Sequence, residues 1–110
     1  EGGLATALHE LAWAAGVGVS VNAEAVPVFP ETQALCNHYH IDPLGLIASG
    51  ALLIVAPASH TEPILKNLGR RGIAATVIGE ITDRRHGIKM ITADGSRDLP
   101  LYEQDEITRI

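Results

Sequence analysis

The sequence predicts a mixed α/β domain in which helices pack on a sheet that contains both parallel and antiparallel strands. Segments with helical hydrophobic spacing alternate with segments of strand length, which is typical of helices packed on a sheet. Some of these strands are separated by a helix, whereas the last ones are joined by short polar turns. A length of 110 residues with 46% hydrophobic content fits one domain with a single core.

The chain opens with a predicted helix and strand. Leu4, Leu8 and Leu11 recur at helical spacing, and Gly16 ends this pattern. Residues 17–23, VGVSVNA, then place a valine at every second position. This is the period of a strand with one buried face.

A second helix is predicted over residues 30–40. Pro30 suits its first turn, because proline lacks the N–H that a helix leaves unpaired there. Asp42 followed by Pro43 is typical of an N-cap and first turn, so a short helix is predicted from this point to Gly50.

The middle of the chain predicts a buried strand and a third helix. Residues 51–57, ALLIVAP, form a continuous apolar run, as expected of a central strand that is covered on both faces. Residues 58–72 have helical spacing, with Ser59 and Glu62 at the separation of a capping box. Pro63 must then lie in the first turn of this helix.

The last part of the chain predicts hairpins. Residues 74–82 and 87–93 read as two strands joined by the polar turn DRRHG. Residues 94–96, DGS, offer a second hairpin turn. The segment over 99–110 shows little periodicity.

Charge and cysteine content exclude several classes of protein. The net charge is −5, and the only basic clusters are the pairs Arg70-Arg71 and Arg84-Arg85, so a nucleic-acid surface is not expected. A single cysteine, Cys36, allows no internal disulfide, and a reducing cytoplasm is the expected location. The longest apolar run is too short to span a bilayer, so no membrane partner is expected.

Few side chains form a catalytic or metal-binding pattern. Cys36 and His40 would share one helix face near His38, but two soft ligands do not make a closed site, and no metal is predicted. Nucleophilic catalysis by this thiol would need an oriented base that the spacing does not supply. The remaining histidines and one strand carboxylate are expected to be solvated: His9, His60, His86 and Glu80.

The pair Gly2-Gly3 precedes the first helix and allows two interpretations. Backbone N–H groups that converge at a helix N-terminus can bind an anion, and glycine lets a phosphate approach closely. Alternatively, the glycines only start the helix. On the first interpretation, a β-branched residue at Gly3 should lower the turnover of the full-length protein strongly. Its cost to folding stability should be only about 1 kcal/mol.

Trp13 lies nearly opposite the leucine stripe of the first helix. It is therefore expected to contact a second surface, in this domain or in another one.

Four blocks in a fixed order carry a resemblance to a known family. They are EGGLATALHELAWAAGVGV, SGALLIVAP, VIGEIT and DEITRI. Together they resemble the C-terminal domain of the aminoimidazole ribonucleotide (AIR) synthetase superfamily, also called PurM-like, and within it the hydrogenase maturation (HypE) branch and its AIR synthase-related relatives. The resemblance implies a three-layer α/β/α fold with a mixed sheet and ferredoxin-like features.

The start of the sequence resembles the junction between the two domains of that family. Glu1, Gly2, Gly3 and Leu4 match the second half of its motif. The resemblance therefore implies that residues 1–110 are the C-terminal domain of a longer protein, with the N-terminal ATP-binding domain outside this sequence.

The resemblance also implies ATP-dependent chemistry. ATP and Mg²⁺ would be bound mainly by the N-terminal domain, usually in a homodimer, and residues 1–110 alone would be inactive and bind neither tightly. The substrate- and phosphate-facing residues would be Glu1, Gly2, Gly3, Ser49 and Gly50, whereas Glu80 matches a mainly structural Gly-Glu pair. No catalytic residue is assigned.

Two functions remain open at this point. The first is an enzyme domain for carbamoyl dehydration in hydrogenase maturation, or a paralogue, with its own N-terminal domain, a second copy and a maturation protein as partners. HypE proteins end in a cysteine that accepts the carbamoyl group, whereas this sequence ends at Ile110. The alternative is a non-catalytic ligand-binding or interaction domain that docks through Trp13.

Overall fold

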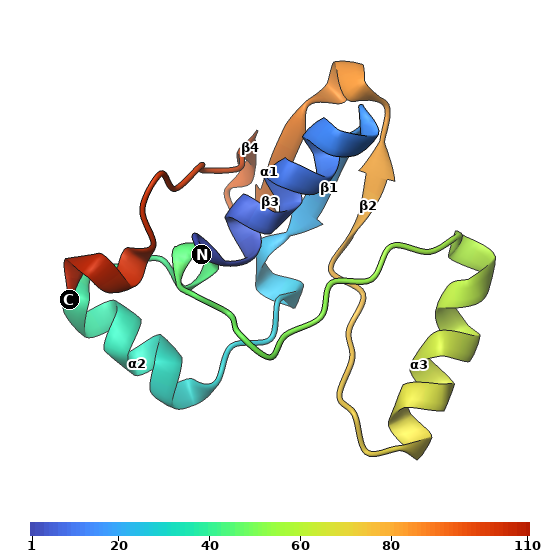
Figure 1. Ribbon diagram of the computed structural model, residues 1–110, viewed down its shortest axis with the longest axis horizontal. Helices are drawn as coiled ribbons and strands as arrows, with labels where there is room; N and C mark the ends of the chain where they lie inside the picture. The colour runs from blue at the N-terminus through green and yellow to red at the C-terminus, as the bar shows by residue number, and fades with distance from the viewer.

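A four-stranded sheet lies at the centre of the molecule (Figure 1). The computed structural model describes all residues from 1 to 110. The strands are β1 (Gly18–Asn22), β2 (Gly79–Thr82), β3 (Ile88–Thr92) and β4 (Gly95–Asp98), in the order β2-β1-β3-β4. β1 is parallel to β3, and the other two pairs are antiparallel. The predicted α/β class with a mixed sheet is confirmed.

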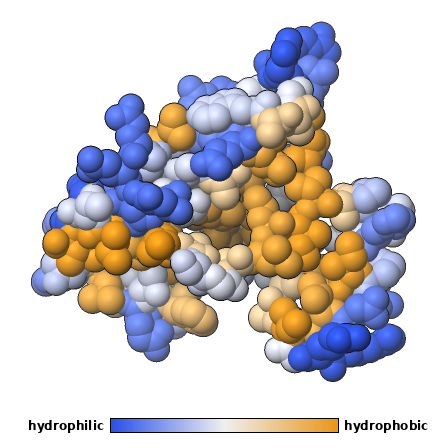
Figure 2. Space-filling model, in the orientation of Figure 1, coloured by the Kyte–Doolittle hydropathy of each residue, from blue (hydrophilic) through white to orange (hydrophobic).

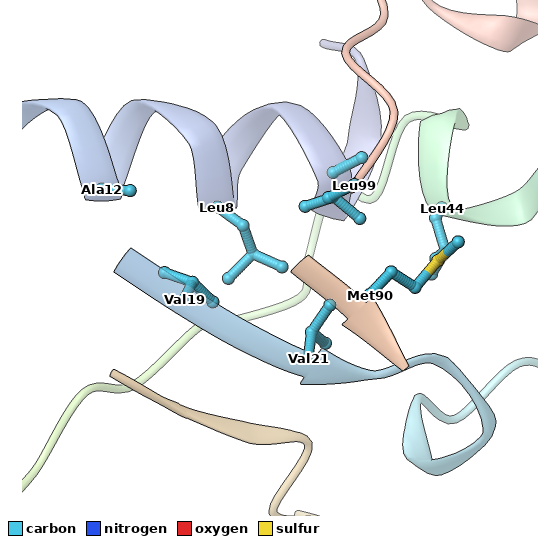
Figure 3. Packing of buried hydrophobic residues seen from close by; sticks show 8 residues of the cluster. Leu8, Ala12, Val19, Val21, Leu44, Met90 and Leu99 are labelled. Atoms are coloured by element: carbon cyan, nitrogen blue, oxygen red, sulfur yellow. The ribbon is translucent and has the colours of Figure 1, made fainter. Parts of the chain in front are cut away.

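One face of the sheet carries the core. Val19 and Val21 of β1 point toward helix α1 (Gly3–Ala15) and are buried, as their alternation predicted (Figure 3). The next row across the sheet, on the opposite face, pairs Ser20 with Glu80 and Lys89. The core cluster comprises Ala5, Leu8, Ala12, Val19, Val21, Leu44, Met90 and Leu99.

Three of the predicted helices are confirmed, with differences at their ends, but the short helix predicted from Pro43 to Gly50 is wrong, because only a 3-10 turn forms there, at Pro43–Gly45. Gly16 ends α1 in the left-handed conformation at φ 67°, and its N–H donates to Ala12. Helix α2 (Pro30–Tyr39) begins at the predicted proline. Helix α3 (Thr61–Arg70) begins after a short 3-10 turn and has no side-chain cap, so the predicted capping box is wrong.

The predicted strand over 51–57 is wrong. This segment is extended, but no backbone hydrogen bond involves residues 52–56. Leu52 is 83% exposed. The predicted strand over 74–82 is shortened to its last four residues, β2, and it pairs with β1 and not with β3, so the predicted hairpin through the turn DRRHG is wrong. A continuous apolar run predicts burial but does not specify which strand will pair with it.

A broad apolar surface follows from these two extended segments. Figure 2 shows hydrophobic side chains gathered over them and over the inner side of α3, whose outer side is hydrophilic. No side chain of α3 is fully buried. The exposed apolar residues of 51–57 and of 73–78 include Leu52, Ile54, Val55, Ile73 and Val77.

The helices are short relative to a bilayer. None of them combines the length and the apolar character that crossing a membrane requires.

Candidate functional site

The two glycines at the start of the chain pack directly on a loop from the middle of the sequence. Gly2 and Gly3 both have left-handed backbones, with φ of 77° and 66°. A Cβ on Gly3 would lie 2.5 Å from the carbonyl oxygens of Leu44 and Leu46. Glycine is therefore required here by the close approach of two backbones. We call residues 42–50 the 42–50 loop.

A buried carboxylate joins this region to the C-terminal segment. Asp105 is 3% exposed. Its Oδ2 accepts a hydrogen bond from the Gly2 N–H at 2.8 Å, and its Oδ1 accepts from the Ile47 and Ile107 N–H groups at 3.0 Å each. Burial acts to raise the pKa of this carboxyl, but the three N–H donors outweigh burial and hold the pKa below its ordinary value.

Glu106 holds the beginning of the same loop. Its Oε2 accepts from the Asp42 N–H at 2.8 Å, and both of its carboxylate oxygens lie 3.1 Å from Nη1 of Arg109. Glu106 is buried, whereas the Arg109 side chain is 57% exposed. The Glu106 carboxylate thus accepts one hydrogen bond from a backbone N–H of the loop and forms one ion pair, with a guanidinium that is partly exposed to solvent.

Tyr102 is the third side chain, with Asp105 and Glu106, that binds the 42–50 loop. Its hydroxyl donates to Oδ2 of Asp42 at 2.5 Å, while Oδ1 of the same carboxylate accepts from the Leu44 N–H at 2.9 Å. The Tyr102 ring and Glu106 leave no room for a Cβ on Gly45. Burial and then the Asp42 hydrogen bond raise the pKa of the Tyr102 hydroxyl, so it remains a donor at neutral pH.

We expect Tyr102→Phe to destabilise the chain by about 2 kcal/mol, because it removes a hydrogen bond to a charged, partly buried acceptor. Urea unfolding of residues 1–110 measures this loss. The matched control is Tyr39→Phe, since Tyr39 is partly exposed and makes no side-chain hydrogen bond. Equal midpoints for Tyr102→Phe and the unmodified chain would contradict the prediction.

The structure brings some of the sequence-predicted site residues together. Glu1, Gly2 and Gly3 lie at the N-terminus of α1, beside the short turn of the 42–50 loop and the C-terminal segment (Figure 1). Ser49 and Gly50 end that loop and are exposed. Gly50 has φ 91° and open space around it. The Gly2 N–H is already donated to Asp105 and is not free for a ligand.

The carboxylate cluster is absent from the sequence-based prediction. Tyr102, Asp105 and Glu106 are not among the predicted site residues, because residues 99–110 lack periodicity. One signal was present. Asp105 accepts from the N–H two residues later and begins a 3-10 turn, as Asp42 does, and this second use of aspartate as a cap was not recognised.

Cys36, His38 and His40, at the end of α2, do not lie together as a group of metal ligands. The helix ends at Tyr39, and His40 is left-handed at φ 56°, so the predicted shared face of Cys36 and His40 is wrong. Cys36 is buried, while both His38 and His40 are exposed. Burial raises the pKa of the Cys36 thiol, and nearby carboxylates add to this. No three potential metal ligands converge in the chain.

The remaining candidates differ in their surroundings. His9 is 8% exposed and its Nε2 lies 2.9 Å from the Leu99 carbonyl oxygen, so the prediction that it is solvated is wrong. Trp13 packs against His9 with the rings tilted by 43° and their centroids 5.5 Å apart, and it remains 60% exposed. Glu80 is exposed in β2, as predicted.

Comparison with known proteins identifies the family. The family described as AIR synthase related protein, C-terminal domain, matches residues 1–91. The chain belongs to this family. The predicted relationship to the AIR synthetase superfamily is confirmed.

Curated relatives of this AIR synthase-related domain include carbamoyl dehydratases. Over its whole length the chain is 34% identical to carbamoyl dehydratase HypE of Rhodobacter capsulatus and 36% identical to that of Cupriavidus necator. It covers 34% and 32% of those proteins. The chain thus spans about a third of the length of the curated relatives that it matches.

Solved structures of HypE proteins share the fold of this AIR synthase-related domain. Escherichia coli HypE matches 99% of the chain at a TM-score of 0.87 and 29% identity, over 35% of its own length. HypE in complex with ATP matches 96% at 0.84 and 32% identity, over 34% of its length. HypE in a HypE–HypF complex matches 92% at 0.84 and 29% identity, over 34% of its length. The PurM-like C-terminal fold is therefore confirmed.

Proposed function

We propose that residues 1–110 are the C-terminal domain of an ATP-dependent enzyme of the HypE type, which acts in hydrogenase maturation by carbamoyl dehydration or in a paralogous reaction. The observation that carries this proposal is the similarity to carbamoyl dehydratases along the entire chain. The HypE structure with ATP supports the nucleotide requirement. The proposed setting is the cytoplasm.

Within the chain, we assign substrate and phosphate contact to the start of α1 and the end of the 42–50 loop. The proposed residues are Glu1, Gly2, Gly3, Ser49 and Gly50. The first three N–H groups of α1 lack helical acceptors, which favours an anion nearby, although the Asp105 carboxylate already occupies one side of this helix terminus. Ser49 adds an exposed hydroxyl.

The buried carboxylates of this chain do not fit a Mg²⁺ site. Both oxygens of Asp105 accept backbone N–H groups, and Glu106 accepts an N–H and a guanidinium. Mg²⁺ needs carboxylate oxygens that are free to coordinate it. We therefore assign Mg²⁺ and most ATP contacts to an N-terminal domain outside residues 1–110.

The proposed partners are that N-terminal domain, a second copy of the protein and a maturation protein. The HypE–HypF complex supports a maturation partner. The exposed apolar side chains of 51–57 and 73–78 supply surface for protein contacts.

A non-catalytic interaction domain is the second candidate function. The exposed indole of Trp13 favours it, because a large aromatic side chain at a surface is typical of a docking site. This candidate predicts partner binding without any effect of the 42–50 loop on ATP turnover.

We expect Ser49→Ala in the longer natural protein to lower kcat/KM for ATP turnover about tenfold, because it removes a hydrogen-bond donor at the proposed site. The matched control is Ser59→Ala, another exposed serine, in the turn before α3, which should leave turnover unchanged. Steady-state phosphate release measures both variants. Unchanged turnover in Ser49→Ala would remove this residue from the site, and a longer protein without any ATP turnover would favour the interaction domain.

A further inference from the structure

A single carboxylate links three segments that are distant in sequence. Asp105 accepts from Gly2, 103 positions away, and from Ile47, 58 positions away, as well as from its own turn at Ile107. The first two donors belong to different sides of the proposed site. Gly2 begins α1, and Ile47 precedes Ser49 by two residues.

The two oxygens of the Asp105 carboxylate accept hydrogen bonds from different segments of the chain. Oδ2 bonds only the Gly2 N–H, whereas Oδ1 bonds the N–H groups of Ile47 and Ile107. Because a carboxylate is planar and the side chain is buried, the positions of Gly2 and Ile47 are coupled.

The rest of the C-terminal segment fixes the other end of the same loop. Glu106 bonds the Asp42 N–H, and Tyr102 bonds the Asp42 side chain. The loop is therefore held at residue 42 by two side chains and at residue 47 by Asp105 alone. The end that approaches Ser49 and Gly50 depends on one side chain.

We infer that Asp105 is a positioning residue, whose carboxylate holds the Gly2–Gly3 segment and the 42–50 loop in one fixed arrangement so that both can face the same phosphate-bearing ligand. The identity of this site rests on the proposed function, whereas the coupling is a property of the chain. Misplacement of a binding group by about 1 Å is sufficient to impair binding and catalysis.

The test uses two variants, of which one changes the acceptor and the other removes the donor of the hydrogen bond between the Ile47 N–H and Asp105. Asp105→Asn keeps the shape and the local turn, because asparagine also caps a turn, but its NH₂ group cannot accept from both distant donors. Ile47→Pro removes the loop N–H without changing Asp105. Leu46, at φ −87° and ψ 138°, already has the conformation that a residue before proline adopts.

The control is Asp83→Asn. Asp83 caps a 3-10 turn in the same way, by accepting from Arg85, but it is exposed and has no distant donor. It therefore reports what loss of the charge does to a local turn alone.

Two measurements decide the inference. In residues 1–110, Asp105→Asn should increase hydrogen exchange of the Ile47 amide at least tenfold, and Asp83→Asn should not. In the longer protein, Asp105→Asn and Ile47→Pro should each raise KM for ATP at least fivefold, measured at a temperature where each variant remains folded. Loss of folded protein alone would lower kcat and leave KM unchanged.

Three results have distinct meanings. An unchanged KM with faster Ile47 exchange would make Asp105 a structural staple only and overturn the inference. Unchanged Ile47 exchange in Asp105→Asn would overturn the coupling itself. If the unmodified longer protein does not turn over ATP, the proposed function fails, and the exchange result alone then decides whether Asp105 holds the loop.

Discussion

Gly3→Ala is expected to destabilise residues 1–110 by about 4 kcal/mol, a large part of the total stability of a domain of this size. Two costs add. The left-handed backbone at φ 66° costs about 1 kcal/mol for a residue with a Cβ, and the methyl group would also lie 2.5 Å from two carbonyl oxygens of the 42–50 loop. Since both neighbours are backbone atoms, α1 or the loop must move.

Gly16→Ala separates these two costs. Gly16 has almost the same φ, 67°, but no atom lies within 4 Å of the position of its Cβ. This control should cost only about 1 kcal/mol. Urea unfolding followed by circular dichroism measures both variants, and the melting temperature of Gly3→Ala should fall by about 15 °C or more. Equal losses in the two variants would show that Gly3 has no steric requirement.

This expectation corrects the sequence-based one. Without the structure, a substitution at Gly3 was expected to impair turnover first and to cost about 1 kcal/mol, because a first-turn glycine at a surface cleft is tolerant. The close approach of the Leu44 and Leu46 carbonyl oxygens makes stability the first property to be lost.

Glu106→Ala is expected to cost about 3 kcal/mol. It leaves the Asp42 N–H without an acceptor in a half-buried site, and it removes methylene groups that pack against Gly45. The ion pair with Arg109 contributes little of this cost, because that side chain is 57% exposed and its charge is screened by solvent.

Glu106→Gln separates the contribution of the hydrogen bond and packing from that of the ion pair with Arg109. Glutamine keeps the packing and an oxygen for the Asp42 N–H but loses the charge that faces Arg109. We expect it to cost about 1 kcal/mol or less, measured by chemical unfolding beside Glu106→Ala. If glutamine costs as much as alanine, the charge and not the hydrogen bond is the main contribution.

Local patterns were sufficient for much of the fold. The leucine spacing ended by Gly16, the proline that starts α2 and the alternation of Val19 and Val21 each specify an element through residues close in sequence. The hairpin between β3 and β4 was indicated by DGS for the same reason, although the turn itself lies at residues 93–94 and Gly95 and Ser96 belong to β4.

The errors concern interactions between distant residues. The apolar run at 51–57 was interpreted as a central strand, but hydrophobicity does not provide a neighbouring strand, and within residues 1–110 none pairs with it. His9 was expected in solvent because nothing in its helix shows that the Leu99 carbonyl oxygen is adjacent.

The candidate site was predictable only in part. The sequence identified Gly2 and Gly3 as unusual, and the resemblance indicated Ser49 and Gly50. Neither identified Asp105, since its role depends on N–H groups 103 and 58 positions away. Such partners leave no periodic trace in a single sequence.

During synthesis on the ribosome, α1 emerges long before the side chain that anchors its start. Asp105 is made 103 positions after Gly2. Strand β1 likewise cannot pair with its parallel neighbour β3 until that later strand has been made. A nascent chain that ends before residue 105 has no side chain to hold Ile47 against the start of α1. The geometry of the 42–50 loop therefore depends on a residue that is made 58 positions after Ile47.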